Sequence, residues 1–133
     1  MPTVTAKVKR HGTNRPRFTV ECPTVRRENR DGKSPVGQKV TWNPDIKGDN
    51  HFSVVGVGRP GDGSDKDEMA FYRVYFGDDG SLSARLKRST RTREFILVVY
   101  DERTEDYYFP AGECDGDVVG VIRPNPRPKV IIT

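Results

Sequence analysis

Two histidines and two cysteines are the residues of this sequence best suited to nucleophilic or metal chemistry: His11, His51, Cys22 and Cys114. A Ser or Cys nucleophile needs a histidine base beside it, and the sequence contains neither a nucleophile elbow nor a cysteine-protease signature. The acidic residues show no spacing that places two carboxylates across one cleft. We therefore expect no enzymatic activity, no catalytic residues and no cofactor.

The two cysteines are far apart in the chain and belong to no CxxC pair of the kind that binds zinc or exchanges disulfides. Two cysteines are also too few for the disulfide framework of a small secreted domain. The favoured interpretation is that Cys22 and Cys114 are small buried hydrophobic residues under reducing conditions. A single bridge between distant parts of the fold is the alternative.

Basic residues gather in two segments, residues 7–33 and residues 85–93. Lys and Arg bind phosphate without reading sequence, and single-strand binding also needs exposed aromatic rings. The aromatic residues lie in apolar segments or beside acids, so we favour contact with acidic protein surfaces and keep nucleic acid as the alternative. The candidates for contact with protein or nucleic acid are Lys7, Lys9, Arg10, Arg15, Arg17, Arg26, Arg27, Arg30, Arg85, Lys87, Arg88 and Arg91.

Charge along the chain is divided into blocks of opposite sign. Residues 1–39 sum to +7 and residues 85–93 to +5, whereas residues 40–84 sum to −4 and residues 94–117 to −7. Complementary blocks can order identical subunits head-to-tail. Self-association or a protein partner is therefore expected.

The apolar residues recur in short β-branched and aromatic runs, at about the 8–12-residue spacing that is typical of sandwiches and barrels. No segment has a helical apolar period. We expect an all-β fold, a single antiparallel β-sandwich of about 8–10 short strands over residues 1–133, with residues 1–17 as a basic arm or edge strand. Strands are predicted at residues 4–9, 18–22, 38–42, 52–57, 70–76, 81–86, 94–100, 106–109, 118–122 and 129–132.

Two hairpins are predicted from local signals. The run Gly77-Asp78-Asp79-Gly80 separates residues 70–76 from 81–86, and a second turn joins residues 94–100 to 106–109. Both alternating faces of residues 95–99 (Phe-Ile-Leu-Val-Val) are apolar. This pattern indicates a central strand covered on both sides, or a strand at an assembly contact.

The stretch Gly37-Gln38-Lys39-Val40-Thr41-Trp42-Asn43-Pro44, followed by His51-Phe52-Ser53-Val54, resembles the G-x-x-V-x-W…H-x-hydrophobic segment of cupredoxin-like sandwiches. The resemblance implies a copper site in which His51 matches the first histidine ligand and Cys114 the cysteine. The residues after Cys114 contain neither the His nor the Met of a full ligand set. The resemblance therefore implies a cupredoxin-like or immunoglobulin-like sandwich that serves as a copper-free binding module, with Trp42 in its core.

The sequence contains no run of about 18 apolar residues, and its first residues lack the apolar core of a signal peptide. We expect a cytoplasmic or virion-associated protein without a membrane partner. The favoured function is that of a protein-binding or self-assembling β-sandwich, as a recognition module or a phage or virus structural subunit. The alternatives are nucleic-acid binding through residues 7–33 and 85–93, and metal binding at His51 and Cys114.

Overall fold

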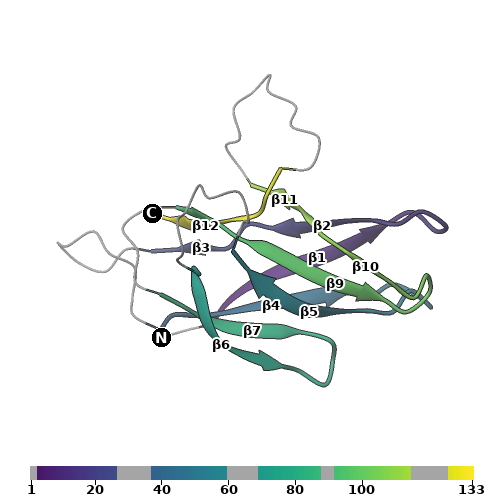
Figure 1. The fold of residues 1–133 in the computed structure, drawn as a ribbon, viewed down its shortest axis with the longest axis horizontal. Helices are drawn as coiled ribbons and strands as arrows, with labels where there is room; N and C mark the ends of the chain where they lie inside the picture. Colours follow the sequence, from purple (N-terminus) through teal and green to yellow (C-terminus); the bar gives the residue numbers. More distant parts are fainter. Residues whose placement is uncertain (1–2, 27–36, 60–68, 88–91, 115–125) are drawn as a thin grey trace.

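Twelve β-strands and no helix make up the described part of the chain, which in the computed structural model covers residues 3–26, 37–59, 69–87, 92–114 and 126–133 (Figure 1). The prediction of an all-β fold is confirmed. In these same ranges no helix is long and apolar enough to cross a membrane.

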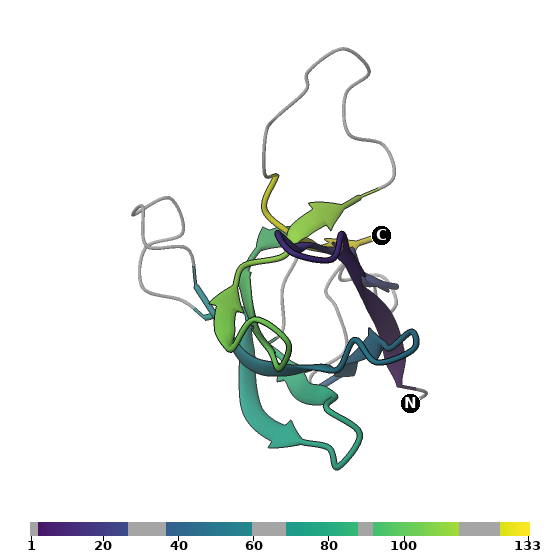
Figure 2. The same ribbon diagram turned by 90° about the vertical axis from the view of Figure 1, so that its right-hand side faces the viewer.

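The strands form three sheets around a common interior, which Figure 2 shows from one end of the molecule. The largest sheet has the order β11-β2-β1-β4-β7-β6. Its strands are β11 (Ala111–Glu113), β2 (Arg17–Glu21), β1 (Val4–His11), β4 (Lys39–Asp45), β7 (Leu82–Leu86) and β6 (Phe71–Phe76). The second sheet is β10 (Asp106–Tyr108), β9 (Ile96–Asp101) and β5 (Phe52–Gly58), and the third is β3 (Thr24–Val25), β12 (Lys129–Ile132) and β8 (Arg93–Glu94).

The predicted strands overlap observed strands, and both predicted hairpins form, as β6–β7 and β9–β10. Strands β3 and β11 are absent from the sequence prediction, and the predicted strand at residues 118–122 lies outside the described residues. Pairing is also less uniformly antiparallel than expected, because β1–β4, β2–β11 and β3–β12 run parallel. Parallel neighbours cannot be joined by a tight turn, so no local signal announces them.

Strand β1 lies inside the largest sheet, so the prediction of a basic arm or edge strand is wrong for Val4–His11. β1 pairs antiparallel with β2 and parallel with β4, which leaves neither of its edges free. Ala6 and Val8 are buried, while Thr5 and Lys7, which alternate with them, are exposed. This two-residue alternation gives β1 an apolar face, which packs against the core. The burial of this face stabilises β1 inside the sheet despite the charges on its other face.

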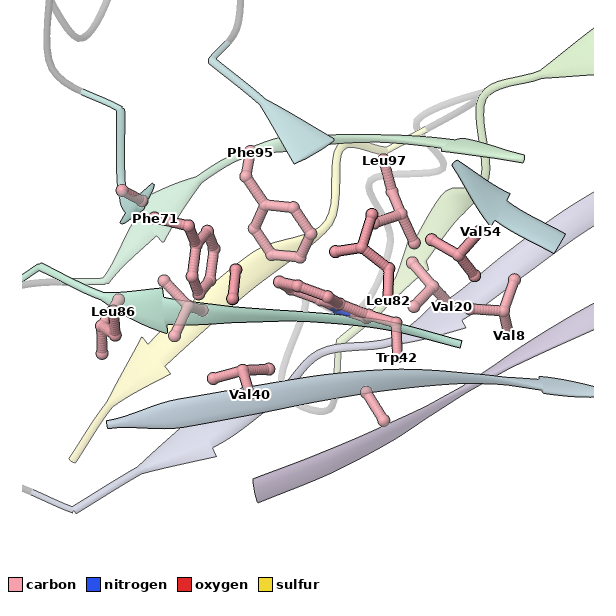
Figure 3. Close-up of a cluster of buried hydrophobic side chains, with 14 of the residues drawn as sticks. Val8, Val20, Val40, Trp42, Val54, Phe71, Leu82, Leu86, Phe95 and Leu97 are labelled. Atoms are coloured by element: carbon pink, nitrogen blue, oxygen red, sulfur yellow. The ribbon is translucent and has the colours of Figure 1, made fainter. Parts of the chain in front are cut away.

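Trp42 of β4 is buried in the core, as the sequence predicts, within a cluster of aromatic rings (Figure 3). The Trp42 ring lies 4.9 Å from that of Phe71 and 5.4 Å from that of Phe95, and these two rings lie 5.3 Å apart. All three side chains are at most 2% exposed. The cluster joins β4 and β6 to the chain just before β9, so it packs the first sheet against the second.

Substitution of Trp42 therefore tests the packing between the sheets. We expect Trp42→Ala to lower the free energy of unfolding by about 3–5 kcal/mol, because it leaves a cavity among aromatic rings. Trp42→Phe should cost less, because the buried Nε1 of Trp42 has no hydrogen-bond partner to lose. Urea denaturation followed by circular dichroism measures both. Equal losses for the two variants would contradict this account of the core.

A disulfide joins Cys22 to Cys114, so the favoured interpretation of two unpaired buried cysteines is wrong. Its cause is the parallel pairing of β2 with β11, which places Glu21 directly beside Glu113. The next residue on each strand is the cysteine, and the two Cα atoms lie 5.0 Å apart, within the range of natural disulfides. The bridge closes a long loop and ties the edge strand β11 to the sheet.

Reduction should destabilise the fold. The two cysteines are separated by 92 positions in the sequence. We expect the Cys22→Ser, Cys114→Ser double variant to unfold with a free energy about 2–4 kcal/mol lower than that of the wild type, because its unfolded chain is less restricted. Urea denaturation with and without a phosphine reductant measures the difference. The reductant should lower the free energy of unfolding of the wild type and leave that of the double variant unchanged. A wild type whose stability does not change with the reductant would show that the bridge is not formed.

Candidate functional site

A buried ion pair between Arg10 of β1 and Asp101 of β9 connects the first two sheets. Arg10 Nε lies 2.9 Å from Asp101 Oδ1, and Arg10 Nη2 lies 3.2 Å from Oδ2. Only 3% of the Arg10 side chain and none of the Asp101 side chain is exposed. Arg10 follows Val8 on the inward face of β1, so the prediction that it contacts a partner is wrong: it is a structural residue.

Further hydrogen bonds complete this pair. Asp101 Oδ2 accepts from the backbone N and the Oγ1 of Thr104, at 3.1 and 2.8 Å, and Tyr108 donates to Thr104 Oγ1 at 3.0 Å. Arg10 donates to the carbonyl oxygens of Gly12 and Thr13. Burial raises the pKa of Asp101, but the hydrogen bonds from Arg10 and Thr104 outweigh it and hold the pKa below its usual range. The pair thus fixes the β1–β2 and β9–β10 turns against each other.

The ion pair makes the stability depend on pH. A carboxyl group whose pKa is lower in the folded state stabilises the fold above its ordinary pKa, and the effect is lost as the pH falls through the folded value. We expect Asp101→Asn to lower the free energy of unfolding by about 3–5 kcal/mol at neutral pH, because Arg10 stays buried without its partner. The difference from the wild type should shrink below about pH 4. Chemical denaturation at several pH values measures it, and a difference independent of pH would contradict this role.

Cations of the two predicted basic segments meet on the outward face of the six-stranded sheet. We call this surface the basic face and define it by Lys7 and Lys9 of β1, Arg17 of β2, Lys39 of β4, Arg85 of β7 and the adjoining Lys87. Strand β4 brings the segments together, since it pairs with β1 on one side and with β7 on the other. The sequence prediction missed Lys39, which lies directly opposite Arg85.

The other predicted contact residues lie elsewhere. Arg15 is exposed in the β1–β2 turn, and Arg26 is exposed after β3. Arg27, Arg30, Arg88 and Arg91 are outside the described residues. The sequence also predicts that the aromatic residues lie apart from the basic segments. In the structure, however, Tyr72 of β6 lies directly opposite Arg85.

The second sheet presents an apolar outward face. Strand β9 lies between β10 and β5, which confirms that it is central in its sheet. Its inward residues Leu97 and Val99 are buried, whereas Ile96 and Val98 point outward and are only partly buried. Opposite these two residues β5 carries glycines, so no β5 side chain covers them there. The sequence predicts a strand covered on both faces or one at an assembly contact. Among the described residues, the outward face of β9 is only partly covered.

An apolar cleft adjoins this face. Its volume is about 200 Å³. Its lining residues are Ile96, Leu97, Phe109, Pro110, Ala111, Pro126, Arg127 and Pro128. Gly112 allows the wall to form: a Cβ there would lie 2.5 Å from Pro128 Cα, and its N–H donates to the Pro126 carbonyl at 2.7 Å. Phe109 stands at the cleft with 71% of its surface exposed.

The β6–β7 hairpin carries the other exposed apolar group. Val74, Tyr75 and Phe76, at the end of β6, are 40%, 52% and 67% exposed. β6 is the outer strand of its sheet, and its register shifts between Tyr72 and Tyr75. Figures 1 and 2 both show the hairpin projecting on the side of the molecule away from β11. The apolar hairpin and the apolar cleft therefore lie on different sides.

The copper site that the sequence resemblance implies does not form. Cys114 is bonded to Cys22 and offers no thiolate while the bridge is intact. His51 is exposed in the β4–β5 loop, where its carbonyl accepts from the N–H of Glu102. Within the described residues, no group of three or more His, Cys, Asp or Glu residues is arranged to hold a metal ion.

Comparison of the sequence with protein-family models and with curated proteins finds no match. The functional conclusion therefore depends on the geometry of the chain itself.

Proposed function

We propose that this protein is a non-enzymatic structural subunit that assembles with further copies of itself. The observation that carries the proposal is the pair of apolar features on different sides of the molecule, the projecting hairpin residues Val74–Phe76 and the cleft beside Phe109. An exposed apolar patch and a matching pocket elsewhere on the same chain favour a heterologous contact, which generates rings or open filaments. The cupredoxin-like or immunoglobulin-like resemblance is consistent with a binding module, but the proposal of self-assembly does not rest on it.

The cleft suits an aromatic side chain. Dry apolar cavities of roughly 150 Å³ accept benzene-sized ligands, and this cleft measures about 200 Å³ between mainly apolar walls. Phe76 is the most exposed apolar residue of the hairpin. Its burial in the cleft of a second copy would remove exposed aromatic surface from both partners, which is the main driving force for such a contact.

The disulfide supports a location outside the reducing cytosol, because such bridges persist at virion and cell surfaces and in secreted proteins. Of the two expected locations, cytoplasmic and virion-associated, we propose the second.

Two single variants and their mixture test the contact. We expect the wild type to form oligomers that increase with concentration in analytical ultracentrifugation. Phe76→Ser and Phe109→Ser should each be monomeric, while an equimolar mixture should form dimers, because one variant keeps the cleft and the other keeps the hairpin. Tyr107→Ser is the matched control, since Tyr107 is 62% exposed but does not line the cleft.

A wild type that stays monomeric at all concentrations would overturn the proposal. So would a Tyr107→Ser control that loses assembly as completely as the two test variants, or a mixture of those variants that remains monomeric.

A further inference from the structure

The basic face adjoins the hairpin at β6 but differs from the assembly surfaces in its chemistry. Its outward residues form rows across the strands. Lys39 lies opposite Arg85, which lies opposite Tyr72; Thr5 lies opposite Thr41, which lies opposite Ser83. His11 lies opposite Arg17 at the other end of the sheet. Cations thus occupy both ends of this face, with hydroxyl groups between them.

The positive charge extends diagonally across four strands. The path begins at Lys39 and Arg85, continues through Lys7 and Lys9, and ends at Arg17. At about 3.3 Å per residue, the distance along the sheet from the Lys39 row to the Arg17 row is roughly 26 Å. Glu21, Asp45 and Glu113 also face outward, so six cations and three acids leave this surface with a net charge of +3. An extended anionic polymer matches both the length and the sign of this surface.

Polar uncharged groups separate the cations. Thr41 Oγ1 and Ser83 Oγ lie 2.7 Å apart, and Asn43 lies beside Lys7 on the neighbouring strand. Ser83 is buried, so Thr5, Thr41 and Asn43 are the uncharged groups here that can donate and accept hydrogen bonds with a hydroxyl-rich polymer. His11 Nε2 lies 2.8 Å from the Oγ1 of buried Thr19, so His11 is the accessible member of a further polar pair on this face.

Two observations favour a polysaccharide over a nucleic acid. Proteins that bind single-stranded nucleic acid combine a basic surface with aromatic rings on which successive bases stack. On the described part of this face, the aromatic rings, Tyr72 and Tyr75, stand only on the edge strand β6. The Cys22–Cys114 disulfide supports an oxidising environment such as a cell surface. Acidic polysaccharides are linear polyanions of that environment.

We propose that the basic face binds an acidic polysaccharide, a linear sugar polymer that carries carboxylate or sulfate groups. Lys7 and Lys9 occupy the middle of the site because β1 lies between the cations of β2 and those of β4 and β7. The contact is mainly electrostatic, so its affinity should fall steeply as salt concentration rises. This site does not depend on the apolar contact between subunits.

The test uses heparin as the sulfated probe, polygalacturonate as the carboxylated probe and a thymidine oligonucleotide as the nucleic-acid probe. Binding is measured by titration calorimetry at low and moderate salt, in a Phe76→Ser background so that self-assembly does not interfere. The double variant Lys7→Glu, Lys9→Glu should bind at least one polysaccharide about tenfold more weakly than its parent. The matched control Arg26→Glu, Arg103→Glu makes the same change of charge at exposed residues outside the basic face and should change affinity about threefold or less.

Circular dichroism of both double variants checks that they fold. Equal losses of affinity in the two double variants would show a non-specific charge effect and overturn the proposal. Tighter binding of the oligonucleotide than of either polysaccharide would identify a nucleic-acid site instead, and no binding of any probe would also contradict the inference.

Discussion

The Arg10–Asp101 ion pair joins the six-stranded sheet to the β10-β9-β5 sheet, and together with the Trp42 cluster it sets the positions of both candidate surfaces. Arg10 lies on the inward face of β1 and Asp101 at the end of β9, at 3% and 0% exposure. A buried charge is tolerated only when it is paired and hydrogen-bonded. The backbone N–H and the hydroxyl of Thr104 and the Gly12 and Thr13 carbonyls provide those bonds, and they leave little freedom in how β1 faces β9.

With β1 held in this orientation, the two-residue period of its sequence decides the rest of the surface. Its even-numbered residues enter the core, so Lys7 and Lys9 face outward together with the cations of β2, β4 and β7. On the other side of the core, the same alternation in β9 directs Leu97 inward and Ile96 outward, and both residues line the cleft. One basic surface and one apolar surface thus lie on opposite sides of the same core.

Local sequence patterns predicted the fold class and several strands, whereas contacts between residues far apart in the sequence were not predicted. Alternating and apolar runs predicted the all-β fold, the β6–β7 and β9–β10 hairpins and the burial of Trp42. The partner of Arg10 is 91 positions away, so its charge looked like that of its exposed neighbours. The parallel pairing of β2 with β11, which brings the two cysteines together, likewise leaves no local signal. The meeting of the two basic segments likewise depends on the parallel pairing of β1 with β4.

The central claim is that the apolar hairpin of one subunit occupies the apolar cleft of the next. Photo-crosslinking measures this contact most directly, with benzoylphenylalanine in place of Phe76 and mass spectrometry of the cross-linked peptides. The account predicts cross-links between subunits from position 76 to Ile96, Phe109, Pro110 or Pro128, which line the cleft. Cross-links to β6 of a second copy would instead indicate a symmetric edge-to-edge dimer, and that result, or the absence of cross-links between subunits, would contradict the account.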